Sequence, residues 1–108
     1  MVTANPRAGR PRSRLVRLVH ERDSYCHLCG LPVDFALKGS NHPLAPTVDE
    51  VVPIVRGGDP LDPDNCRLAC RCCNTSRGAK PITAAVRARC RALSLMHRGQ
   101  VTPTVIEW

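Results

Sequence analysis

Seven cysteines carry the most evident chemistry of this 108-residue chain. Four of them form two Cys-x-x-Cys pairs, Cys26/Cys29 and Cys70/Cys73. The turn within each pair lets two thiolates converge on one cation, and four thiolates in a tetrahedron are the ligands of a structural zinc site. The spacing therefore predicts a Zn²⁺ bound by these four residues. The alternative is a set of redox-active or simply buried thiols.

The other three cysteines are Cys66, Cys72 and Cys90, and the first two offer alternative zinc ligands. Neighbours on a helix point about 100° apart, so Cys72 and Cys73 cannot both face one ion, and the spacing favours Cys73. We expect the remaining three cysteines to be small apolar residues of the core. The odd total also argues against a fully paired disulfide framework.

Acidic and amide side chains lie between and beside the cysteine pairs. The run Val48-Asp49-Glu50-Val51-Val52-Pro53 leads into an Arg-Gly-Gly loop at 56–58, Asp64-Asn65 precedes Cys66, and Asn74 follows Cys73 in the stretch Cys-Asn-Thr-Ser-Arg-Gly. Taken with the cysteine pairs, this arrangement over residues 25–80 resembles the HNH endonuclease family, in the variety with two zinc knuckles that occurs in bacteria and phages.

The resemblance implies a ββα-metal nuclease, in which a hairpin and a helix hold one divalent cation against the scissile phosphate. Asp49 and Asn74 match the family's metal-binding positions, and Asn65 matches the residue that braces the loop. An oxygen site of this kind suits Mg²⁺ or Mn²⁺ better than zinc. The resemblance also implies a phage nuclease that works beside the DNA-packaging terminase.

Glu50 departs from the family, because most members have there the histidine that activates water. A carboxylate at this place could still deprotonate water or bind the cation, but an unperturbed glutamate is a poorer base than histidine near neutral pH. The alternative is therefore a catalytically degenerate, zinc-stabilised DNA-binding module. His42, in the loop before the first strand, is a candidate substitute base, whereas we expect His27 in the first knuckle to face solvent.

The charge balance predicts a polyanionic partner. Sixteen basic residues outnumber nine acidic ones, for a net charge of +7, which favours DNA. Only three aromatic residues are present, too few for a single-strand stacking platform, so we expect phosphate contacts and low sequence specificity. The candidate contacts are Arg56, Arg71, Arg77 and Lys80, with the arginines before residue 15 and a basic face of the last helix made by Arg87, Arg91 and Arg98.

Apolar and turn-forming residues predict the elements that position these groups. Residues 1–22 form a basic arm and a short helix that begins at Ser13, and the arm up to residue 12 has almost nothing to bury. Strands are expected at 47–52 and 66–70, a short helix at 71–76, and a last helix capped by Thr83 that runs to about residue 98. Adjacent strand residues point to opposite faces, so Asp49 and Glu50 can share a site only at a strand end or a bulge.

The predicted fold is α+β: a small treble-clef, ββα-metal domain over residues 23–80, stapled by a zinc site of four cysteines. Residues 81–108 add a C-terminal helix and tail, and we expect a monomer. No stretch is apolar enough to cross a membrane, and the first fourteen residues lack the apolar core of a secretory signal. We therefore expect a cytoplasmic protein, in a bacterium or a phage-infected cell.

Overall fold

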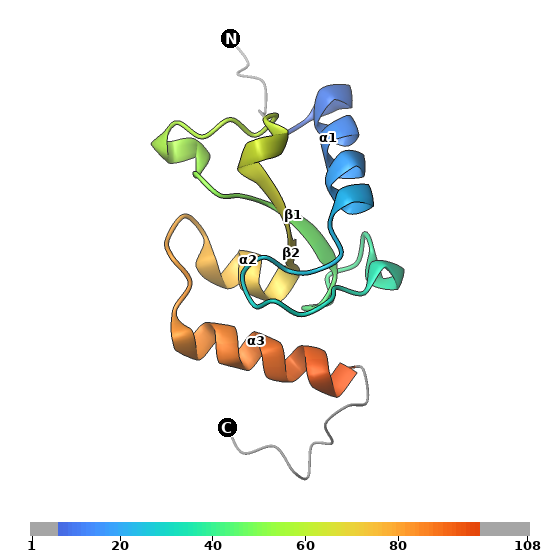
Figure 1. The fold of residues 1–108 in the computed structure, drawn as a ribbon, viewed down its shortest axis with the longest axis vertical. Coiled ribbons are helices and arrows are strands. Elements are labelled where there is room, and N and C mark those ends of the chain that lie inside the picture. Colours follow the sequence, from blue (N-terminus) through green and yellow to red (C-terminus); the bar gives the residue numbers. More distant parts are fainter. Residues whose placement is uncertain (1–6, 98–108) are drawn as a thin grey trace.

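The computed structural model describes residues 7–97, and within them it has the predicted α+β architecture. A hairpin of β1 (Pro46–Glu50) and β2 (Cys66–Cys70) leads directly into α2 (Arg71–Arg77). Helix α1 (Gly9–Arg22) lies along one side of the hairpin, and α3 (Ala84–His97) lies below α2 (Figure 1). None of the helices described is long and apolar enough to cross a membrane.

The hairpin is antiparallel, with Asp49 opposite Arg67 and Glu50 opposite Cys66. Strand β1 ends at Glu50, two residues before the expected end. The chain beyond it is held differently: Val51 N donates to the backbone oxygen of Asn65, and Val52 N donates to its side-chain Oδ1, both at 2.8 Å. A side chain therefore replaces the strand partner at Val52, which ends the ladder next to the two acidic residues.

The core is small and rich in sulfur. Leu15 and Val19 of α1 pack with Leu68 and the buried cysteines against the hairpin. So small a number of buried aliphatic side chains provides little hydrophobic stabilisation for a domain of this size. A metal held by the buried cysteines could therefore add to the stability of this core.

Helix α1 begins at Gly9 rather than at Ser13, so the predicted start is wrong by four residues. The Ser13 hydroxyl does not cap the helix but donates to the carbonyl of Gly9 at 3.2 Å. Arg12 is buried and donates to the carbonyl of Pro60 at 2.6 Å and to Glu50 at 3.4 Å. The expectation that the arm has nothing to bury is thus wrong for Arg12, while residues 1–6 lie outside the part described.

Two adjacent residues fasten the end of α1 to the hairpin. Arg22 pairs with Asp23 and also donates to the carbonyls of Pro63 and Cys66, at 2.9 and 2.6 Å. Asp23 accepts a hydrogen bond from Leu68 N at 3.2 Å. The hydrogen bond from Arg22 lowers the pKa of Asp23.

Helix α3 is capped by Thr83, as predicted: its hydroxyl accepts a hydrogen bond from Val86 N at 3.2 Å. Cys72 and Cys90 form a disulfide between α2 and α3, so the expectation that both are unpaired core residues is wrong. The helical rotation that keeps Cys72 from facing the same ion as Cys73 turns it towards α3 instead. Cys66 is a buried free thiol as expected, and burial raises its pKa.

Gly58 holds the loop after β1 close to the hairpin. A Cβ at this residue would lie 1.7 Å from the carbonyl oxygen of Val52. We expect Gly58→Ala to lower the free energy of unfolding by about 3 kcal/mol or more, because the backbone at Val52 must move to accommodate the added methyl group. Gly57→Ala is the control: Gly57 has a φ of +89° but no atom near the added Cβ, so only about 1–2 kcal/mol of backbone strain is expected. Urea denaturation measures both, and equal losses would contradict the steric explanation.

Candidate functional site

The four predicted cysteines meet at one point. The Sγ atoms of Cys26, Cys29, Cys70 and Cys73 all lie within 4.8 Å of one another, and all four residues are buried. Cys70 ends β2 and Cys73 lies in the first turn of α2, while the first pair occupies a turn closed by a Gly30 N to Cys26 O hydrogen bond of 2.8 Å. Four buried sulfurs at this spacing fit a structural zinc ion.

Electrostatics within the cluster also favour a cation. Hydrogen bonds from the other three thiols lower the pKa of Cys26 far below its ordinary value. Hydrogen bonding to Cys26 and Cys29 in turn raises the pKa of Cys70 and Cys73. Contacts with Cys70 and Cys73 lower the pKa of Cys29 to about 7, whereas deprotonation is opposed at Cys70 and Cys73. A bound cation would allow all four thiols to be ionised together.

Helix α3 secures the first knuckle. Arg87 donates to the carbonyl of Leu28 at 2.9 Å, and Arg91 donates to the carbonyl of Cys29. These two arginines were expected to form a DNA-binding face, but they hold backbone oxygens beside the sulfur cluster. Arg98, the third member of that predicted face, lies outside the described residues.

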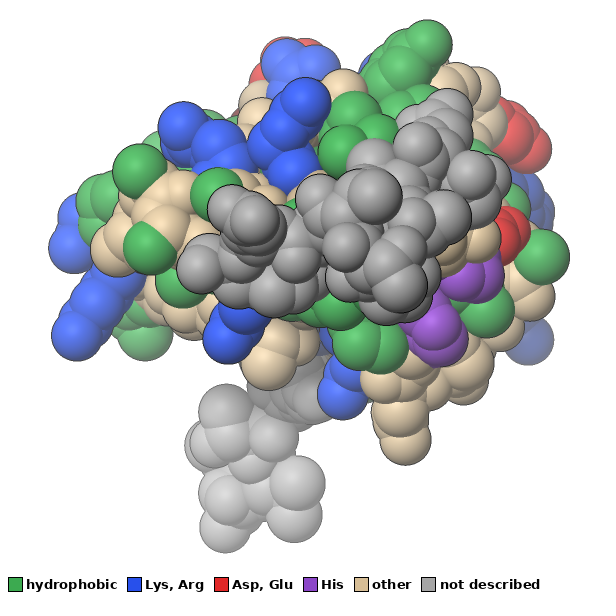
Figure 2. Space-filling view, turned by 90° about the horizontal axis from the view of Figure 1, so that it is seen from below, with side chains coloured by type: hydrophobic (Ala, Val, Ile, Leu, Met, Phe, Trp, Pro, Cys, Tyr) green, Lys and Arg blue, Asp and Glu red, His purple; other side chains and the backbone are tan. Residues whose placement is uncertain are grey.

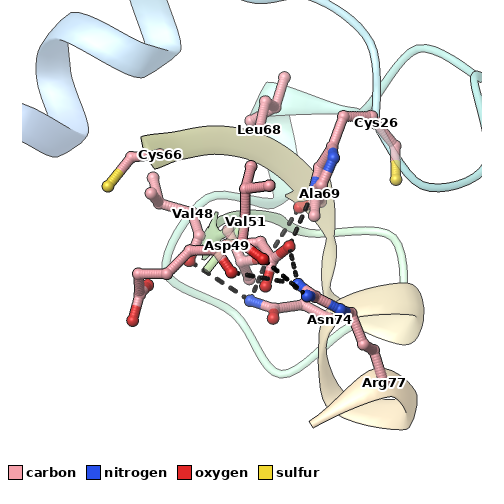
Figure 3. A network of polar contacts seen from close by, with 12 residues as sticks. Cys26, Val48, Asp49, Val51, Cys66, Leu68, Ala69, Asn74 and Arg77 are labelled. Atoms are coloured by element: carbon pink, nitrogen blue, oxygen red, sulfur yellow. Dashed lines mark hydrogen bonds and ion pairs between the residues drawn. The ribbon is translucent and has the colours of Figure 1, made fainter. Parts of the chain in front are cut away.

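A pocket of about 480 Å³ lies at the end of the hairpin, and Asp49, Glu50 and Asn74 all line it. The two acids come from the end of β1 and the amide from α2. Figure 3 shows Asp49, Asn74 and Arg77 converging beside the strands. The pocket therefore brings together the acidic dyad and the helix residue that the sequence singled out.

Asp49 is buried and its Oδ2 accepts two contacts. One comes from His27 Nε2 at 2.7 Å, and the other from Arg77. Arg77 also donates to the backbone oxygens of Glu50 and Val51, at 3.2 and 3.0 Å, and only 10% of its side chain is exposed. Arg77, expected to contact DNA, is thus committed to the end of β1.

His27 is exposed, as expected, but the sequence analysis missed its contact with the site. Its side chain, 26% exposed, also contacts Asp49. Its backbone N donates to Leu68 O at 2.9 Å, which lays the zinc knuckle against the hairpin. Because residue spacing gives no sign of this packing, only the folded arrangement reveals the contact.

Glu50 is buried and accepts contacts from two arginines. Nε and Nη2 of Arg7 lie 2.8 and 2.6 Å from Oε1, and Nη2 of Arg12 lies 3.4 Å from Oε2. The side chains of Asp49 and Glu50 therefore border one pocket with separate sets of partners. This is consistent with alternating side chains at the end of a strand.

The two asparagines serve different parts of the site. Asn74 donates through Nδ2 to Thr47 Oγ1 at 3.1 Å and to Val48 O at 3.4 Å, which leaves Oδ1 as the atom that could bind a cation. Asn65 instead donates to the carbonyls of Val52 and Asp59, both at 3.1 Å. It braces the loop and does not line the pocket.

The other candidates lie outside the pocket lining. Arg56, Arg71 and Lys80 are absent from it, and the basic residue that does line it is Arg7. His42 is also absent: its Nδ1 accepts a hydrogen bond from Leu44 N at 3.1 Å, and its ring lies 5.1 Å from that of His97. In the described part of the chain, the cysteine cluster alone groups three or more His, Cys, Asp or Glu ligands.

We expect Cys70→Ser to abolish zinc binding and to unfold the domain. Structural zinc contributes about 10 kcal/mol of apparent binding free energy in small domains, which this core cannot replace. Cys66→Ala removes a buried thiol outside the cluster and should keep one zinc per chain. Metal analysis with thermal melting compares the two variants, and a folded, zinc-free Cys70→Ser protein would refute the assignment.

The comparisons with known proteins agree with this geometry. The family model of HNH endonucleases matches residues 26–80, which include the cysteine cluster, the hairpin and α2. No curated protein and no solved structure matches the chain. The match covers more than half of the chain and contains the whole candidate site except Arg7 and Arg12. The protein therefore belongs to the HNH endonuclease family.

Proposed function

We propose that this protein is a divalent-metal-dependent endonuclease that hydrolyses phosphodiester bonds in DNA. The observation that carries the proposal is the pocket that Asp49, Glu50 and Asn74 line together, within the part of the chain that matches the family. An acidic pair and an amide at the end of a hairpin supply the oxygen ligands and the proton acceptor that such a reaction requires.

The residues present fit a catalytic Mg²⁺ or Mn²⁺. Oδ2 of Asp49 is occupied by His27 and Arg77, so Oδ1 is available as a ligand, together with Oδ1 of Asn74. Hard oxygen donors with room for waters suit these ions. The bound ion would polarise the scissile phosphate and stabilise the leaving oxygen. His27 and Arg77 fix the orientation of the Asp49 carboxylate.

Arg7 is the group in this pocket that is placed to bind the phosphate. Its side chain is 53% exposed although it pairs with Glu50, so it can reach a ligand. We propose that Arg7 transfers its contact from Glu50 to a phosphate oxygen when DNA binds. This exchange frees Oε1 of Glu50 to accept a proton from water, while Arg12 remains bound to Oε2.

The proposal extends to a cytoplasmic phage nuclease that works beside the DNA-packaging terminase, for which the support is the resemblance alone. The activity itself is tested with supercoiled plasmid and zinc-loaded protein, with and without Mg²⁺ or Mn²⁺. We expect nicked or linear DNA only with an added ion. Bound but intact plasmid under every condition would instead indicate the degenerate DNA-binding module.

We expect Glu50→Gln to reduce cleavage by about 10²-fold or more, as is usual for the loss of a general base. Asp49→Asn should reduce cleavage similarly and also weaken Mn²⁺ binding, since it removes the anionic ligand. Glu50→His should preserve or raise activity near pH 7, where imidazole is the better base. Full activity of folded Glu50→Gln at equal metal would place the base elsewhere, and His42 would then be changed next.

The contact of His27 with Asp49 makes a separate prediction. His27→Ala should raise the Mn²⁺ concentration needed for half-maximal cleavage several-fold, because a partner that orients the Asp49 carboxylate is lost. His27→Gln retains an N–H donor and should restore part of the affinity. Zinc content serves as the control in both variants. An unchanged Mn²⁺ requirement in His27→Ala would show that the contact between His27 and Asp49 does not contribute to metal binding.

A further inference from the structure

A second cavity, of about 570 Å³, shares Arg7 with the catalytic pocket. It lies along α1, and we call it the α1 groove. Its lining contains four basic residues and no acidic one: Arg7, Arg12, Arg17 and Lys38, beside Ser13 and Val16. Arg12 and Arg17 come from the helix and Lys38 from the loop after the first knuckle, so the tertiary fold assembles this charge.

The groove keeps most of its positive charge. Arg7 and Arg12 share one carboxylate, that of Glu50, whereas neither Arg17 nor Lys38 takes part in an ion pair among the described residues. Both of these side chains are exposed. The four basic side chains of the groove therefore have one carboxylate, that of Glu50, as their ion-pair partner among the described residues, and the remaining positive charge suits a polyanion.

The positive surface continues along the helix. Arg10, Arg14 and Arg17 lie four and three residues apart, so they form one stripe of α1, and all three are exposed. At 1.5 Å per residue this stripe is about 10 Å long. That length corresponds to about three base pairs of a duplex.

We propose that the α1 groove binds backbone phosphates of duplex DNA beside the scissile bond, and that Arg7 links this groove to the catalytic pocket. The inference rests on the proposed function and assigns the path along which DNA leaves the site. Neither Tyr25 nor Phe35 lines the groove, so the groove has no aromatic side chain on which the bases of a single strand could stack. Arg77, one of the candidate phosphate contacts, pairs with Asp49, whereas Arg17 and Lys38 of the groove form no ion pair among the described residues.

The test must separate the groove from general charge, because basic side chains are also spread over the α3 end of the molecule (Figure 2). The groove variant is Arg17→Gln with Lys38→Gln. The control is Arg67→Gln with Arg89→Gln, which removes the same charge from exposed residues that line neither cavity. Thermal melting should be unchanged in both.

Binding of a labelled duplex is measured by fluorescence anisotropy over a range of salt, with zinc-loaded protein and no added Mg²⁺ or Mn²⁺. For the groove variant we expect about 10-fold weaker binding in low salt and a slope of log affinity against log salt that is flatter by about 1.8. The control should keep the slope of the parent. An unchanged slope in the groove variant, or an equal change in both, would overturn the proposal.

Two further measurements sharpen the assignment. The first repeats the salt titration with single-stranded DNA of the same length. If the groove variant flattens the salt slope for the single strand but not for the duplex, the duplex is not the ligand of the groove. In cleavage assays the groove variant should raise KM while kcat stays within about two-fold, since its residues bind DNA away from the reacting atoms. If the parent protein does not cleave, the proposed activity fails, yet the anisotropy slopes still decide whether the groove binds DNA.

Discussion

The convergence of four cysteine sulfurs is the interaction on which the rest of the structure depends. It joins the first knuckle, the end of β2 and the start of α2 at one buried point. The free energy of zinc binding in such sites, about 10–16 kcal/mol, is comparable to the entire stability of a typical domain, about 5–15 kcal/mol. With so few aliphatic residues in the core, this cluster decides whether the hairpin and helix meet at all.

The candidate active site is built on that cluster. His27 belongs to the knuckle and Arg77 to the helix that carries Cys73, and both contact the same oxygen of Asp49. The Asp49 carboxylate is therefore oriented by two elements whose relative position depends on the cysteines. Disruption of the cysteine cluster would therefore misplace Asp49 even where the hairpin survived.

Helix α1 adds a second connection, outside the segment that the family model matches. Arg12 of this helix and Arg7, which precedes it, bind the carboxylate of Glu50. A carboxylate at this position holds two arginines beside the pocket through charge-assisted hydrogen bonds. These two contacts connect the candidate site to the surface proposed to bind DNA.

Local chemistry allowed much of this structure to be predicted from the sequence. The Cys-x-x-Cys spacing identified the sulfur cluster, and strand and helix propensities located β2, α2 and α3. These features depend on residues close in sequence or on a repeated spacing. The start of α1 was misjudged because Arg12 is stabilised by Glu50 and Pro60, which lie far along the chain.

Only the tertiary structure decided which partners the charged side chains take. His27 on Asp49, Arg77 on β1, Arg87 on the knuckle and Cys72 on Cys90 are all contacts between segments far apart in the chain. The type of a residue states what it can bind, but long side chains reach several partners of similar energy. The packing of the backbone selects among them, and no sequence spacing records that choice.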